Sequence, residues 1–179
     1  MDDFGDESEW RLAAVDSGQT ALGINELSIA IVKPKVLLYS VRQEPIFADF
    51  YAEITASPSL CVGVDEYGLL FRYASPADFY RFSLSCNGQV RLDRVLGGQA
   101  ASPQPWISSS SVPNGAPSST RLGVWAVGDE MTFFINDEFQ FSIRDAMLPS
   151  GRLGVFARSA GDNAVSVSFS NLVVKEINP

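Results

Sequence analysis

Apolar and polar residues alternate, one by one, in short runs along most of the chain. Residues 50–54 alternate Phe, Ala and Ile with Tyr and Glu, and residues 80–84, 90–93 and 165–170 follow the same rule. Successive side chains of a β-strand point to opposite faces, so each run predicts a strand with one buried face. No window carries a sustained apolar stripe of helical spacing. Roughly a dozen short strands are predicted, which favours an all-β fold, a two-sheet antiparallel β-sandwich.

Turn signals separate these runs. Asn87-Gly88 lies between two alternating segments, and both residues tolerate the positive φ that a two-residue hairpin turn requires. Asn136-Asp137 occupies the same kind of position between residues 131–135 and 138–143. These turns predict antiparallel hairpins.

The 179 residues are 46% hydrophobic, which is enough to build one core. We therefore expect a single β-sandwich domain over residues 1–179. Residues 97–120 break the rhythm, because this stretch is rich in Gly, Ala, Ser and Pro. We expect it to form a long surface crossover, anchored by Trp106; loops of this length are often functional or mobile.

Charge and histidine content exclude several functions. The formal net charge is −8 and the sequence contains no histidine. A nucleic-acid partner and an anionic membrane surface are disfavoured, because both require a basic patch. The absence of histidine excludes Ser-His-Asp nucleophiles and zinc sites that need imidazole. The apolar stretch 27–41 is too short and too interrupted by lysines to cross a bilayer, so no direct membrane insertion is expected.

Several segments share a pattern of core aromatics and turn glycines: Asp2–Phe4 with Trp10, Gly68–Arg72, Asp78–Phe82, Gly128–Phe141, Ser150–Phe156 and Val167–Leu172. They resemble the concanavalin A-like jelly-roll domains of the laminin-G-like and 3-keto-disaccharide-hydrolase-like group. This resemblance implies a secreted or surface-tethered, extracytoplasmic protein. Glucanases of the wider superfamily carry Glu-x-Asp-x-x-Glu on one strand, which this chain lacks, so we infer a non-catalytic member.

In the resembled folds the concave sheet binds sugars. If the apolar residues of the central strands face the core, their polar neighbours share the opposite face. Aromatic rings can pack on the C–H side of a sugar, and arginine and carboxylate groups can bond its hydroxyls. The predicted ligand-binding residues are Tyr51, Glu53, Arg72, Arg81, Arg91 and Asp93, with Trp106 closing over them. The alternative is a solvated sheet face with cross-strand ion pairs.

Cys61 and Cys86 flank the central hairpin, and they form either a disulfide in an oxidising compartment or two buried thiols. We expect the disulfide. Sandwich domains of this type sometimes bind Ca²⁺ where their terminal strands meet, so the resemblance implies a possible site at Asp2, Asp3 and Asn171. Asp65-Glu66 is interpreted as a pair of solvated turn charges.

Two tryptophans carry separate expectations. Trp10 is expected to pack in the core. Trp125 is out of phase with the apolar residues Leu122, Val124 and Ala126, so it lies either exposed or under a loop.

Three functions remain open. The first is a non-catalytic module that binds a glycan or polysaccharide. The second is a structural or protein-interaction module of a surface or secreted protein, with a protein partner and no small ligand. The third is a glycosidase-like enzyme with two carboxylates about 5–10 Å apart, although no residue pair in the sequence points to it.

Overall fold

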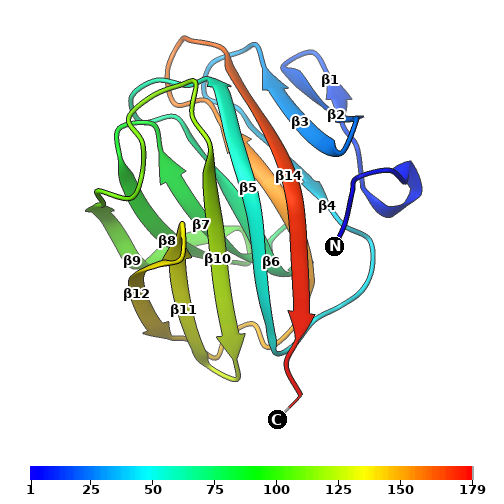
Figure 1. Cartoon of the computed structure of the whole chain (residues 1–179), viewed down its shortest axis with the longest axis vertical. Helices are drawn as coiled ribbons and strands as arrows, with labels where there is room; N and C mark the ends of the chain where they lie inside the picture. Colours follow the sequence, from blue (N-terminus) through cyan, green and yellow to red (C-terminus); the bar gives the residue numbers. More distant parts are fainter. Residues whose placement is uncertain (179) are drawn as a thin grey trace.

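A computed structural model describes residues 1–178 as two antiparallel β-sheets packed face to face (Figure 1). Pro179, the last residue of the predicted domain, lies outside the described residues. The predicted two-sheet sandwich is confirmed. Within residues 1–178, no helix is long and apolar enough to span a membrane.

The eight-stranded sheet has the order β1 (Ala14–Val15), β2 (Gly18–Gly23), β3 (Glu26–Ile31), β14 (Val165–Glu176), β5 (Phe50–Leu60), β10 (Thr120–Val127), β11 (Glu130–Ile135) and β12 (Glu138–Arg144). The six-stranded sheet has the order β4 (Leu37–Val41), β13 (Arg152–Arg158), β6 (Glu66–Ser75), β7 (Asp78–Ser85), β8 (Gln89–Leu96) and β9 (Gln99–Ser108). One short 3₁₀ helix, η1 (Glu7–Glu9), precedes β1.

The core lies between the sheets and is rich in aromatic rings. Phe82 of β7 and Phe133 of β11 meet across it with their centroids 4.8 Å apart, and Phe141 of β12 stacks on Phe133 at 4.6 Å. Phe71 and Tyr80 stack at 5.2 Å within the six-stranded sheet. Each ring is contributed by an inward position of its strand, as the two-residue alternation predicts. The outer faces of both sheets are thereby left for polar residues.

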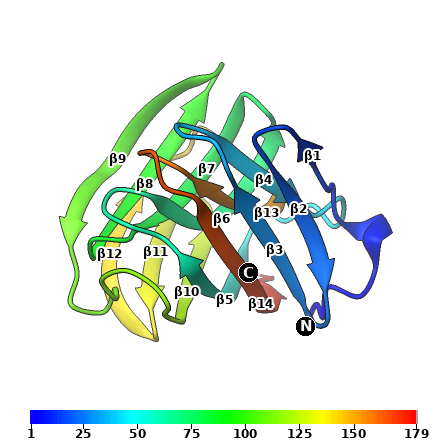
Figure 2. The ribbon, with the colours of Figure 1, turned by 90° about the horizontal axis from the view of Figure 1, so that it is seen from above.

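The two sides of the sandwich are closed differently. On one side, β2 and β3 of the larger sheet contact β4 of the smaller sheet (Figure 2). On the other side, the edge strands are β9 and β12. There, Ser109 Oγ donates to Gln140 Oε1 and Ser111 Oγ donates to Glu138 Oε2, each at 2.5 Å. Side chains, rather than a continuous ladder, join the sheets at this edge.

The prediction of a crossover loop over residues 97–120 is wrong for the first half of that range. Residues 99–108 form β9, which pairs with β8 and contains Trp106. β9 is an edge strand, and an edge strand tolerates Pro103 and Pro105 because one of its sides needs no ladder hydrogen bonds. The low apolar content therefore reflects an edge strand with mostly exposed residues.

Trp10 is buried as expected, and Cys61 and Cys86 form a disulfide with Cα atoms 5.9 Å apart. The bridge links the end of β5 to the residue after β7, and so ties one sheet to the other. Asp65 supports the intervening loop, since its carboxylate accepts from Val62 N at 3.1 Å and Ala160 N at 2.8 Å. This end of the sandwich is therefore cross-linked both covalently and by hydrogen bonds.

Removing the bridge is expected to lower stability. A Cys61→Ser, Cys86→Ser double variant should lose about 3 kcal/mol of unfolding free energy, because the unfolded chain regains the freedom of a loop of 25 residues. Urea denaturation monitored by tryptophan fluorescence measures the difference. A reductant should destabilise the parent to a similar degree and leave the double variant unchanged. Equal stability of parent and variant without reductant would contradict the prediction.

Candidate functional site

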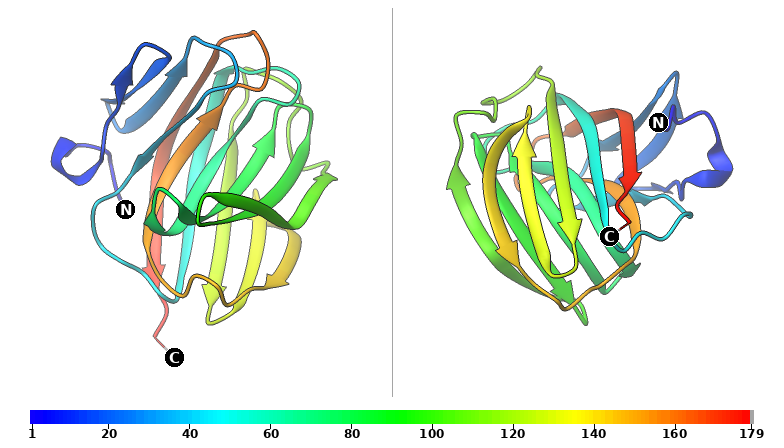
Figure 3. Two further views of the ribbon diagram at one scale, coloured as in Figure 1. Left: turned by 180° about the vertical axis from the view of Figure 1, so that it is seen from behind. Right: turned by 60° about the horizontal axis from the view of Figure 1, so that its bottom comes forward.

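Five polar residues from three adjacent strands share the outer face of the six-stranded sheet, which Figure 3 shows from behind in its left panel. They are Glu66 of β6, Arg81 and Ser83 of β7, and Arg91 and Asp93 of β8. Their positions follow from the alternation, because the residues between them point into the core. Register places Ser83 opposite Arg91 and Arg81 opposite Asp93.

Ion pairs connect four of these side chains. Arg91 Nη2 lies 2.9 Å from Glu66 Oε2 and 3.1 Å from Asp93 Oδ2, and Arg81 Nη2 lies 2.7 Å from the same Asp93 oxygen. The Glu66 and Asp93 side chains are only 1% and 3% exposed. Ser102 of β9 donates to the other Asp93 oxygen at 2.6 Å. Ion pairs removed from water to this degree fix the orientation of both guanidinium groups.

Aromatic rings support the two arginines. The Arg91 guanidinium carbon lies 4.3 Å from the centroid of Trp106, and the Arg81 guanidinium carbon lies 5.7 Å from the centroid of Phe156 on β13. Cation–π contacts of this length stabilise a charged group at a partly dry surface. Trp106 therefore lies on the predicted face, where its ring stacks on the Arg91 guanidinium group.

The face also carries an apolar region beside the ion pairs. Leu70, Tyr73, Phe79 and Phe156 belong to a second hydrophobic cluster, separate from the core between the sheets. Tyr73 and Phe79 stack with centroids 5.6 Å apart. Gly68 lies beneath Phe156, where a Cβ atom would come within 3.2 Å of the ring and 2.0 Å of a backbone oxygen. The absence of a side chain at Gly68 is what lets the ring pack so closely.

Two buried polar atoms at the centre of this face have no hydrogen-bond partner among residues 1–178: Glu66 Oε1 and Ser83 Oγ. Arg158 Nη1 of β13 lies 3.9 Å from Glu66 Oε1. Burial raises the pKa of the Glu66 carboxyl, and the neighbouring Arg91, Arg81 and Arg158 charges offset only part of that effect. Buried polar atoms are normally paired, so these two are exceptions. The groups that solvent reaches on this face are the Arg81 and Arg91 side chains, at 12% and 18% exposure.

The interpretation of Asp65-Glu66 as solvated turn charges is wrong, since both residues are buried. Glu66 opens β6 and shares the outward parity of Gly68 and Leu70. Its place in the alternation of β6 was the one sequence signal that could have put Glu66 on the same outer face as Arg81.

Tyr51 and Glu53 were predicted on the same face as Arg81, and this placement is wrong. Both belong to β5 of the eight-stranded sheet, and they point outward on the opposite side of the sandwich. Parity within a strand separates inward from outward residues, but it does not say which sheet holds the strand. Tyr51 and Glu53 are therefore separated from Arg81 by the whole core.

Arg72 was predicted on the ligand face, but its side chain is completely buried. A β-bulge interrupts the pairing of β6 and β7 after Phe71, and Arg72 adopts a φ of 45°. Its guanidinium group donates to the backbone oxygens of Ala48 at 2.8 Å, Gly128 at 2.9 Å and Leu148 at 3.3 Å. Arg72 joins three loops at one end of the sandwich and has no access to a ligand.

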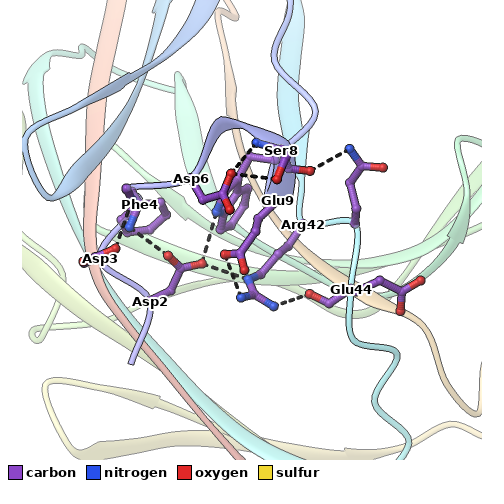
Figure 4. Close-up of polar contacts among 11 residues, drawn as sticks. Asp2, Asp3, Phe4, Asp6, Ser8, Glu9, Arg42 and Glu44 are labelled. Carbon is purple, nitrogen blue, oxygen red and sulfur yellow. Dashed lines mark hydrogen bonds and ion pairs between the residues drawn. The ribbon is translucent and has the colours of Figure 1, made fainter.

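The residues of the expected calcium site do not fit a cation. The Asp2 carboxylate accepts from Phe4 N at 2.7 Å, Trp10 Nε1 at 3.1 Å and Arg42 Nε at 2.8 Å (Figure 4). These donors occupy the oxygens that calcium would need, and Arg42 already neutralises their charge. Asp3 bonds the backbone of Gly5, and Asn171 is exposed beside the Asp2–Leu172 bridge. Within residues 1–178, no group of three His, Cys, Asp or Glu side chains could hold a metal. The cluster fixes the N-terminal segment instead.

Several solved structures share this fold. The carbohydrate-binding module CBM66 from Bacillus subtilis superposes with a TM-score of 0.74 at 15% identity, over 94% of this chain and 96% of that one. The catalytic domain of an endo-1,3-β-glucanase (laminarinase) from Thermotoga petrophila gives 0.68 at 8% identity, over 99% and 96%. Sheep galectin-11 gives 0.53 at 13% identity, over 79% and 98%. No protein-family model and no curated protein matches the chain.

The fold is thus a concanavalin A-like jelly-roll β-sandwich, as the resemblance implied. Neighbours of this fold include both binding modules and glycoside hydrolases, so the fold alone does not assign a function. The assignment depends on the residues of the outer faces.

Arg72 offers a stability test that separates its structural role from a binding role. Arg72→Ala should lower the unfolding free energy by about 3 kcal/mol, because the backbone carbonyl groups of three loops lose their shared donor and the buried volume of the side chain is left empty. Chemical denaturation gives the value. The matched control is Arg144→Ala, whose side chain is 69% exposed and should change stability by about 0.5 kcal/mol or less. Similar small effects for both variants would show that the buried guanidinium is dispensable.

Proposed function

We propose that this protein is a non-catalytic carbohydrate-binding module that holds its sugar on the outer face of the six-stranded sheet. One observation carries the proposal: the guanidinium groups of Arg81 and Arg91, whose side chains are 12% and 18% exposed, are held in fixed directions on this face by buried carboxylates and by aromatic rings. A carbohydrate-binding module among the proteins of the same fold supports it.

The chemistry of a sugar hydroxyl suits this set of groups. A sugar hydroxyl can accept hydrogen bonds from the partly exposed guanidinium groups of Arg81 and Arg91, and from Arg158 of β13, whose side chain is 42% exposed beside them. The side chains are already ordered, which lowers the entropy cost of binding. Phe156 and its apolar neighbours offer contact to the C–H groups of the ring.

The pairing of the carboxylates supports binding without hydrolysis. Glu66 and Asp93 accept from the same Arg91 nitrogen, and Asp93 also accepts from Arg81 and Ser102. A glycosidase needs one carboxylic acid that gives up a proton and a second carboxylate free to attack carbon or activate water. Asp93 has its oxygens engaged by three donors, so it is poorly suited to either task.

The proposed setting is extracytoplasmic. The Cys61–Cys86 disulfide supports this location, because disulfides persist in oxidising compartments.

The binding face can be tested with two variants that act differently on the fold. Arg158→Ala removes a side chain that is 42% exposed on this face, so it should leave stability nearly unchanged and weaken sugar binding about fivefold to tenfold. Arg91→Ala should abolish detectable binding and also lower stability, since Glu66 stays buried without its cation. A glycan array followed by calorimetry on the best ligand measures both.

Lys33→Ala, in the exposed segment between β3 and β4, is the control and should bind like the parent. Silence of the folded parent across the array would contradict the proposal and favour a structural or protein-interaction module. Unchanged binding by Arg158→Ala and Arg91→Ala would show that sugar binds elsewhere.

A further inference from the structure

The opposite side of the sandwich carries a row of aromatic side chains that the proposed function does not use. Tyr51, Trp125, Phe134 and Phe139, here called the aromatic row, come from β5, β10, β11 and β12. These strands are neighbours in the eight-stranded sheet, and Figure 1 shows them side by side. Register pairs Tyr51 with Trp125 and Phe134 with Phe139.

All four side chains point outward, because the alternating residues of the same strands fill the core. The first three rings are half-buried, and Phe139 is 63% exposed. A β-bulge in β12 puts Phe139, rather than Gln140, opposite Phe134, and so turns a fourth ring to the outer face. Trp125 falls between the two alternatives of the sequence analysis, because it is half-buried on the outer face of the eight-stranded sheet.

The Tyr51 ring is held along the surface of the sheet. A Cβ atom added to Gly123 would lie 3.1 Å from Tyr51 Oη and 3.7 Å from its Cε2, so the ring extends over the glycine backbone. Tyr51 Oη donates to Glu53 Oε2 at 2.9 Å, which fixes the direction of the ring. A ring in this position covers the glycine with one side and leaves its other side for a ligand.

Polar groups lie next to the aromatic row. Thr132 and Ser142 continue the line from Trp125, and their hydroxyl oxygens are 2.9 Å apart. Together with Glu130 and Arg144 they line a shallow depression of about 380 Å³ at the edge of the row. Hydroxyl and charged groups beside aromatic rings can bond a ligand that packs its apolar side on the rings.

The size of the aromatic row limits what it can hold. Four strands spaced about 4.8 Å apart, with two positions along each, cover about 15 Å by 7 Å. A stable protein interface needs about 800 Å² from each partner, several times this area. On β14, Lys175 lies opposite Tyr51 and Val173 opposite Glu53. Farther along, the outward positions of β5 and β14 are serine and threonine, so the apolar patch ends there. A patch this narrow fits a single extended chain of ring-shaped units.

From this geometry we propose that the aromatic row is a second binding site, which takes an extended, neutral polysaccharide chain across β5, β10, β11 and β12. The sugar rings pack on the aromatic faces, and their hydroxyls bond Glu53, Thr132 and Ser142. This site goes beyond the proposed function, because it is on the other sheet and shares no residue with the Arg81–Arg91 face.

Affinity electrophoresis in gels that contain xylan, laminarin or glucomannan, together with pull-down on microcrystalline cellulose, tests the second site. Phe139→Ala and Trp125→Ala should each weaken retention on the polysaccharide bound best by about tenfold. Ile24→Ala removes an apolar side chain that is 93% exposed elsewhere, and should change nothing. Phe139→Ala is not expected to affect folding, because the ring contributes little to the core.

Each variant is measured in the parent and in the Arg158→Ala background, so that the two faces are separated. If the aromatic-row variants lose retention on the polysaccharide in both backgrounds, the result supports the second site, even if the Arg81–Arg91 face binds nothing. Equal retention of all variants on all four materials would overturn it. A parent that sediments as a dimer and becomes monomeric on Phe139→Ala would also overturn it, by showing that a second copy covers the row.

Discussion

Neither sheet can leave its apolar side in water, so each must cover the other. This constraint determines most of the molecule: inward positions are filled by Phe, Ile, Leu and Val, and the strands align so that rings such as Phe82 and Phe133 meet across the core. It also decides where function can lie. With both inner faces committed to packing, the outer faces and the ends of the sandwich are the surfaces where ligand chemistry can vary without loss of the fold.

The outer face of the six-stranded sheet contains buried charged groups, and burying them costs free energy. Burying Glu66 and Asp93 removes their hydration, and the arginines only partly offset that loss, as the raised pKa of Glu66 indicates. Apolar residues of similar size would have stabilised the sheet as well or better. Under the proposed function this cost serves recognition, since ordered donors discriminate between ligands that differ by one hydroxyl.

Sequence reasoning succeeded where a single periodicity governs the structure and failed where two strands had to be compared. The sandwich and the hairpin turns follow from local patterns, the buried Trp10 was expected from the resemblance, and Cys61 and Cys86 are the only two cysteines of the sequence. The sheet that holds β5 depends on long-range topology, so Tyr51 could be assigned an outward direction but not a side of the molecule. The prediction for Arg72 was wrong for a different reason: a bulge breaks the alternation at that residue, and no composition signal marks it. Glu66 was overlooked because two adjacent acidic residues were interpreted as turn charges, although its parity matched the outer face.

The two outer faces differ in the kind of contact they can make. The binding proposed for the Arg81–Arg91 face depends on hydrogen bonds from guanidinium groups held in fixed directions, so a wrong hydroxyl leaves a donor unpaired and costs affinity steeply. The contact proposed for the aromatic row depends on the apolar sides of rings, which sugars of many kinds present in similar form. The first arrangement favours selectivity for one sugar unit and the second favours tolerance along a chain. The two sheets, with a core about 10 Å thick between them, separate these faces, so a ligand on one face leaves the other free.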